Sequence, residues 1–168
     1  RSTLFPYTTL FRSRTGQYCS SRTVREYTEQ HYFPAAERYR ERAANNGALG
    51  VQVMKWQHAL EENWAVLRFG EVKVETDAEQ HLFEVLVYLE DLDPNAVRVE
   101  LYADAIDGSG TVRQAMKRVR EPVGTAGGYA YHARVPATRP AAHYTPRVIP
   151  NFGGVAVPLE AAWVLWRP

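Results

Sequence analysis

The sequence lacks a second cysteine, an excess of charge and a long apolar run. Cys19 is the only cysteine among 168 residues, so no internal disulfide can form and nothing indicates an oxidising compartment. Twenty basic against nineteen acidic side chains give a net charge of +1, far from the basic excess of nucleic-acid-binding proteins. No apolar run approaches the roughly 20 residues that cross a bilayer. We therefore expect a cytoplasmic protein that binds neither nucleic acid nor membrane.

The first 13 residues stand apart from the rest of the chain. They show neither a helical nor an alternating pattern of apolar residues, and they do not lead into the segment that follows. Residues 6–13 look like the translation of a common sequencing-adapter oligonucleotide, which would make residues 1–13 an artefact of assembly. The alternative is a disordered terminus. Both interpretations exclude these residues from the fold.

Helical signals come next along the chain. The hydroxyl of Thr23 and the carboxylate of Glu26 have the spacing of a capping box, so we expect a helix to begin at Ser21 or Thr23. Pro34 lacks the backbone N–H that a helix interior uses, and we expect the helix to break or restart there. The Asn-Asn-Gly run at residues 45–47 predicts the end of this helix.

A further helix is expected over residues 48–63. Its apolar side chains recur at a near-heptad spacing and therefore share one face. They are Leu49, Val53, Trp56 and Leu60. Because the helical segment offers no apolar surface of its own to cover this face, we expect the segment to pack against a partner.

After Trp64 the apolar period changes from that of a helix to two. Residues 83–89 alternate most clearly, and residues 97–101 follow them across a turn at Pro94. Further candidate strands are residues 66–76, 112–121, 129–135, 144–149 and 162–166. About seven short strands predict an immunoglobulin-like antiparallel β-sandwich rather than a barrel, and hence an α+β chain. The apolar phase shifts at Gly70, which predicts a bulge there.

No group of residues has the spacing of a catalytic or metal site. The five histidines are scattered, so we predict no metal site. Cys19 precedes the first helix without a neighbouring base, and we interpret it as an inert thiol. Asp104 and Asp107 beside Gly108 fit a hairpin turn better than a calcium loop, because the full set of oxygen ligands is missing. We therefore expect no catalytic residue.

Aromatic side chains are the remaining candidates for binding, because exposed rings form stacking surfaces for sugars. Trp56 lies on the apolar helix face, and Tyr129 and Tyr131 share the apolar face of their strand, so we interpret these three as core or interface. The candidates for contact with a sugar or with another protein surface are Tyr88, Tyr102 and Trp163. The basic stretch at residues 113–120 fits protection of a sheet edge better than phosphate binding.

Short motifs along the chain resemble the C-terminal region of the bacterial α-glucan (glycogen/maltodextrin) phosphorylases. Residues 14–27 are similar to the segment that leads into and begins the last long helix of that family, although an Asp is usual before Arg22. The other motifs are Tyr32-Phe33-Pro34-Ala35-Ala36, Asn63-Trp64, Arg68-Phe69-Gly70-Glu71-Val72, Tyr102-Ala103-Asp104 and Tyr144-Thr145-Pro146-Arg147-Val148-Ile149-Pro150. The resemblance spans residues 14–168.

The resemblance implies a parent enzyme that cleaves terminal α-1,4 links of a glucan with inorganic phosphate. It releases glucose 1-phosphate and uses pyridoxal phosphate as an acid/base on the phosphate side. The chain has only three lysines, Lys55, Lys73 and Lys117, and none has the Gly/Ser/Asn-rich setting of the family's cofactor lysine. We therefore expect no cofactor in this chain and pyridoxal phosphate only in the parent.

The resemblance also implies the organisation of the chain. Residues 14–63 are expected to be the terminal part of a parent catalytic domain, and residues 64–168 a β-sandwich domain. The expected partners are the missing catalytic lobes, with glucan reached only indirectly, and the chain alone is expected to be an inactive C-terminal fragment. The alternative is a stand-alone β-sandwich module that binds a carbohydrate or a protein.

Overall fold

The computed structural model describes residues 19–106, 110–119 and 127–168. The predictions for residues 1–13, Asp107 and Gly108 lie outside these ranges. Contacts divide the chain into two units, a first that ends at Val51 and a second that comprises Gln52–Pro168. The domain boundary between residues 63 and 64 stays a prediction.

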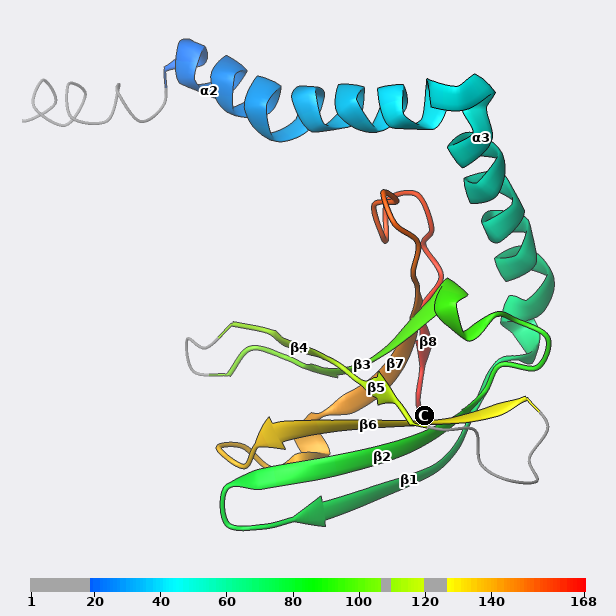
Figure 1. The fold of residues 1–168 in the computed structure, drawn as a ribbon. Coiled ribbons are helices and arrows are strands. Elements are labelled where there is room, and N and C mark those ends of the chain that lie inside the picture. The colour runs from blue at the N-terminus through cyan, green and yellow to red at the C-terminus, as the bar shows by residue number, and fades with distance from the viewer. Residues whose placement is uncertain (1–18, 107–109, 120–126) are drawn as a thin grey trace, which may run out of the picture. The chain divides into compact units, whose positions relative to one another are not determined.

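Two sheets of antiparallel strands follow the helical segment (Figure 1). The strands are β1 (Arg68–Thr76), β2 (Gln80–Tyr88), β3 (Val97–Ala103), β4 (Val112–Ala115), β5 (Lys117–Arg118), β6 (Gly128–Pro136), β7 (Thr145–Pro150) and β8 (Leu165–Trp166). Sheet A has the order β1-β2-β6-β5 and sheet B the order β4-β3-β7-β8. The predicted α+β chain with an antiparallel sandwich is confirmed. The described residues form eight strands rather than about seven, because the stretch from residue 112 contributes two.

The first helix, α2 (Ser20–Tyr27), continues through a π-helical turn (Thr28–Tyr32) into α3 (Phe33–Asn63). Pro34 accounts for this turn, because its missing N–H leaves the carbonyl four residues earlier without a helical donor. The wider turn lets the N–H of Phe33 donate to the carbonyl of Thr28. Pro34 therefore alters the helix without ending it.

The predicted capping box at Thr23 and Glu26 does not form. The helix begins at Ser20 with Cys19 as its cap, so Thr23 lies inside the helix and its hydroxyl donates to the carbonyl of Cys19 at 3.4 Å. Glu26 pairs with Arg22 one turn earlier, at 3.0 Å between Oε1 and Nε. An ion pair at this spacing competes for the carboxylate that a capping box would use.

Helical geometry is interrupted at the predicted Asn-Asn-Gly stop. Asn45, Asn46 and Gly47 have φ angles of 53°, 58° and 77°. These left-handed conformations are costly for most side chains, and Asn and Gly tolerate them best. The interruption separates the first part of α3 from a second helical part that ends at Asn63.

The end of α3 packs against the sandwich. Val53, Trp56 and Leu60 are buried and belong to the main core, as the apolar spacing predicts. Trp56 Nε1 donates to the carbonyl of Ala96 at 3.0 Å, and Gln57 Nε2 donates to the carbonyl of Glu160 at 3.1 Å. This helical end is therefore held to the sandwich by both apolar burial and hydrogen bonds. A 3₁₀ turn (Trp64–Val66) then leads into β1.

The core lies between the two sheets and consists of the inward positions of the strands. On β2 the buried apolar residues are Phe83, Val85 and Val87, and on β3 they include Val99 and Leu101. Short 3₁₀ turns at Pro94–Ala96 and Ala141–His143 precede β3 and β7. The alternation along β2 and β3 thus predicts these buried apolar side chains correctly, whereas Glu100 on β3 is buried against the pattern.

One strand changes sheets partway along. β4 pairs with β3 up to the partners Ala115 and Glu100, and β5 then pairs with β6 from the partners Lys117 and His132. Met116 lies at the crossing, with its N–H donating to the carbonyl of Val99 at 2.9 Å. Strands that switch sheets form the corners of many sandwiches.

Gly70 occupies the predicted bulge. The β1–β2 register shifts between Phe69 and Val72. A Cβ at Gly70 would lie 2.9 Å from side-chain atoms of both Leu86 and Tyr88, closer than real Cβ contacts. A larger residue at this position would force the side chains of Leu86 and Tyr88 to move, so the close approach of the neighbouring strand favours glycine.

Candidate functional site

The three aromatic candidates lie in three different places. Tyr88 ends β2, and the guanidinium of Arg68 lies 3.9 Å from its ring centre. The same guanidinium pairs with Glu90 at 3.1 Å. The guanidinium of Arg68 thus covers one face of the Tyr88 ring. Among the described residues, Tyr88 makes no ring contact with Tyr102 or Trp163.

Trp163 lies beside the core. Its ring centre is 6.2 Å from that of Trp64, and both side chains are partly buried against the core cluster. Such a ring offers less free surface for stacking than an exposed one. Of the two roles predicted for Trp163, contact with another protein surface therefore fits its position better than contact with a sugar.

Tyr102 lies on the outer face of sheet B, and the structure places Trp166 next to it. Their ring centres are 5.3 Å apart with an interplanar angle of 80°. The guanidinium of Arg147 lies 4.4 Å from the centre of Tyr102 and 4.9 Å from that of Trp166. Trp166 remains 43% exposed. We call Tyr102, Arg147 and Trp166 the aromatic–arginine cluster.

The strand register explains why these three side chains meet. Arg147 on β7 is the direct partner of Trp166 on β8 and of Glu100 on β3. Tyr102 follows Glu100 by two residues and therefore points to the same face of the sheet. Its hydroxyl donates to Oδ1 of Asp104 at 2.9 Å, and this hydrogen bond raises the pKa of Tyr102.

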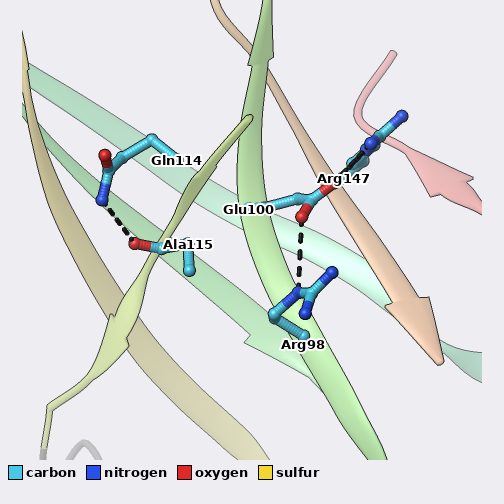
Figure 2. Close-up of polar contacts among 5 residues, drawn as sticks. All are labelled: Arg98, Glu100, Gln114, Ala115 and Arg147. Carbon is cyan, nitrogen blue, oxygen red and sulfur yellow. Dashed lines mark hydrogen bonds and ion pairs between the residues drawn. The ribbon is translucent and has the colours of Figure 1, made fainter. Parts of the chain in front are cut away.

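Glu100 forms the charged base of the cluster. Figure 2 shows Arg147 and Arg98 approaching its carboxylate from two directions. Arg147 Nε donates to Oε1 at 2.7 Å, Nη2 of the same guanidinium also donates to Oε1, and Arg98 Nε lies 3.4 Å from Oε2. The side chains of Glu100 and Arg147 are only 4% and 13% exposed. Two guanidinium groups therefore share one buried carboxylate.

The sequence prediction missed Trp166 and Arg147 as members of this site. A run from residue 162 to 166 suggests one strand, but β8 contains only Leu165 and Trp166, so Trp163 lies outside it. The pairing that brings Trp166 to Arg147 joins positions 19 apart. The sequence does show an apolar residue followed by an aromatic one, Leu165 and Trp166, near its end. This pattern is typical of a strand but does not indicate which strand it pairs with.

The described residues do not contain a group of three or more His, Cys, Asp or Glu side chains that could hold a metal. Cys19 is exposed. In the parts of the chain that the structure describes, no helix has both the length and the apolar character needed to cross a membrane.

The chain is similar to one family of protein domains. The family model described as the glycogen phosphorylase C-terminal domain matches residues 64–168. This range begins at the 3₁₀ turn before β1 and includes all eight strands. No curated protein and no solved structure matches the chain.

Proposed function

The chain belongs to the glycogen phosphorylase C-terminal domain family, and we propose that it is the non-catalytic C-terminal part of an α-1,4-glucan phosphorylase. In the proposed parent reaction, inorganic phosphate cleaves the terminal α-1,4 link of a glucan and releases glucose 1-phosphate. The family match over residues 64–168 is the observation that carries this proposal. The chemistry would belong to catalytic lobes that precede residue 14 in the parent.

The helical segment would connect the sandwich to those lobes. Its first part exposes large apolar side chains, among them Tyr27, Tyr32, Phe33 and Tyr39. An isolated helix gains most of its stability from burying an apolar face, so exposed aromatic residues support a missing partner. We propose that the catalytic lobes cover these side chains and that the sandwich, joined through Trp56 and Leu60, supports the helix.

Pyridoxal phosphate would bind to the parent's catalytic lobes and would supply acid/base chemistry at the phosphate. The lysines of this chain do not fit that cofactor. Lys55, Lys73 and Lys117 are all exposed, and Lys73 pairs with Glu71 at 3.6 Å. A Schiff-base lysine needs a desolvated setting, and these exposed side chains do not have one.

Two measurements test the proposal. Genomic DNA upstream of the codon for Arg14 should continue in frame into a phosphorylase catalytic domain, and a stop codon followed by a start codon would contradict this. The purified chain, incubated with glycogen and phosphate, should release no glucose 1-phosphate. Release above the rate of a heat-denatured sample would overturn the assignment as a non-catalytic part.

A second candidate function, a module that binds glucan, is favoured by the aromatic–arginine cluster. Trp166 presents an exposed ring, and Arg147 and Asp104 could donate to or accept from sugar hydroxyls. Co-sedimentation with glycogen tests this function. Binding that is lost in Trp166→Ala but kept in Tyr39→Ala, a matched change of an exposed aromatic residue in the helix, would support it.

A further inference from the structure

The change of sheets at Met116 leaves a depression beside β3. Its volume is about 240 Å³, and its lining includes Asn95, Arg98, Met116, Arg118, Tyr131 and Asn151. Drug-sized ligands occupy pockets of ~300–1,000 Å³, so this one suits a smaller molecule. It lies outside the aromatic–arginine cluster, and it arises because β4 no longer covers the edge of β3 after Ala115.

Tyr131 carries a buried hydroxyl that lacks a hydrogen-bond partner, the sole such side-chain atom in the described part of the chain. The residue as a whole is 4% exposed. Burial raises the pKa of Tyr131 to about 12, so the hydroxyl keeps its proton at neutral pH and can donate. Most buried polar groups are paired, and an unpaired one in a native structure calls for a missing partner.

The charge around this hydroxyl is positive. Arg118 and Tyr131 are direct partners in the β5–β6 register, and the guanidinium of Arg118 partly offsets the rise in the pKa of Tyr131. Arg118 is exposed, and within the described residues its guanidinium lies 5.7 Å from the ring centre of Tyr129 rather than against a carboxylate. Arg98 adds a second guanidinium, which shares Glu100 with Arg147.

Two carboxylates bind side chains that line the depression, Glu100 through Arg98 and Asp93 through Asn95. Asp93 accepts hydrogen bonds from the backbone and side-chain amides of Asn95, at 2.9 and 3.0 Å. Oδ1 of Asp93 is therefore occupied by hydrogen bonds from Asn95. The side-chain amides of Asn95 and Asn151 already donate within the protein, and Arg98 pairs with Glu100. The donors of the lining that remain for a ligand are the guanidinium of Arg118 and the hydroxyl of Tyr131, and the positive charge of Arg118 favours an anion over a neutral sugar.

We propose that this depression binds a small oxyanion, either inorganic phosphate or the phosphate group of a larger molecule, with donors from Arg118 and Tyr131. The Tyr131 hydroxyl has almost no accessible surface, so a ligand reaches it only when a covering side chain moves. Arg118 is exposed, and its long side chain can turn toward the bound anion. This site does not depend on the proposed parent reaction.

Calorimetric titration of the full chain at low, constant ionic strength tests the proposal. The probes are orthophosphate, glucose 1-phosphate and glucose. We expect both phosphates to bind and glucose not to bind. Tyr131→Phe and Arg118→Gln should each weaken phosphate binding about tenfold or more, because each removes a hydrogen bond to a charged group. Both variants keep most of the side-chain volume, and circular dichroism verifies folding.

Arg113→Gln provides the matched control, because Arg113 is exposed on β4 opposite Tyr102 and does not line the depression. It should bind phosphate as the unmodified chain does. Tighter binding of glucose 1-phosphate than of orthophosphate would identify a phosphate ester as the ligand, and the reverse would identify free phosphate. Absence of phosphate binding, equal binding of glucose, or equal affinity in all three variants would overturn the proposal.

Discussion

Arg147 and Glu100 face each other as direct partners on β7 and β3, with Nε of the arginine 2.7 Å from Oε1 of the carboxylate. Both side chains are largely buried although they lie on the outer face of sheet B. Removing two charges from water is costly, and their attraction offsets that cost only when the geometry is good. Removing only one of the two charges should therefore lower the stability of the fold, because the other charge would stay buried without its partner.

Glu100→Gln should lower the free energy of unfolding by about 3 kcal/mol, because it leaves Arg147 buried without its counter-ion. Urea unfolding measures this change. Glu90→Gln is the matched control, since Glu90 pairs with Arg68 at 3.1 Å but both side chains are more than a third exposed. The control should lose less than about 1 kcal/mol. Equal losses in the two variants would contradict the special role of the buried pair.

The same pair shows what the sequence predicts and what it does not. The alternation of apolar and polar residues predicts that Val99 and Leu101 are buried and that Glu100, which lies between them, is exposed. Glu100 is nevertheless buried, because β7 places Arg147 against it from 47 positions away. Strand alternation is local information, whereas the choice of partner strand depends on tertiary packing.

The split of residues 112–121 into β4 and β5 has the same cause. The local pattern is continuous through Met116, and only pairing first with β3 and then with β6 divides it. The bulge at Gly70 and the stop at Asn45 and Asn46 were predictable, because glycine and asparagine report backbone geometry locally. The aromatic–arginine cluster was only partly predictable, since Tyr102 was identified without Arg147 or Trp166.

Tyr131→Phe should raise the free energy of unfolding by about 1 kcal/mol in phosphate-free buffer. The change removes a buried hydroxyl that has no partner and keeps the ring. Tyr102→Phe is the control with the opposite sign, because its hydroxyl donates to Asp104 at 2.9 Å. It should leave stability unchanged or lower it by up to about 1 kcal/mol. Thermal and urea unfolding of both variants measure the difference, and destabilisation by Tyr131→Phe would indicate a partner for the hydroxyl.

The stability of the chain at alkaline pH should also depend on the buried hydroxyl of Tyr131. Its pKa is raised to about 12 by burial, whereas an unfolded tyrosine titrates near pH 10. Above about pH 10 the unfolded chain releases this proton while the folded chain holds it, so stability falls as the pH rises toward 12. The fall should be smaller in Tyr131→Phe. Unfolding midpoints of the two proteins at pH 8 and pH 11 test this, and a difference that does not depend on pH would contradict it.

Trp56→Phe should loosen the end of α3 from the sandwich. The substitution removes part of a buried ring and the hydrogen bond from Nε1 to the carbonyl of Ala96 at 3.0 Å, and this carbonyl then accepts only from the N–H of Asn151, at 2.9 Å. We expect a loss of about 1–3 kcal/mol in the free energy of unfolding. Trp166→Phe makes the same chemical change at an exposed ring and should cost less than about 1 kcal/mol.

Hydrogen exchange separates local from global effects: amides of residues 52–63 should lose protection in Trp56→Phe before those of β2 and β3 do. If the strands and the helix lost protection together, the helix would be part of the cooperative core and the hydrogen bond would not act as a local attachment.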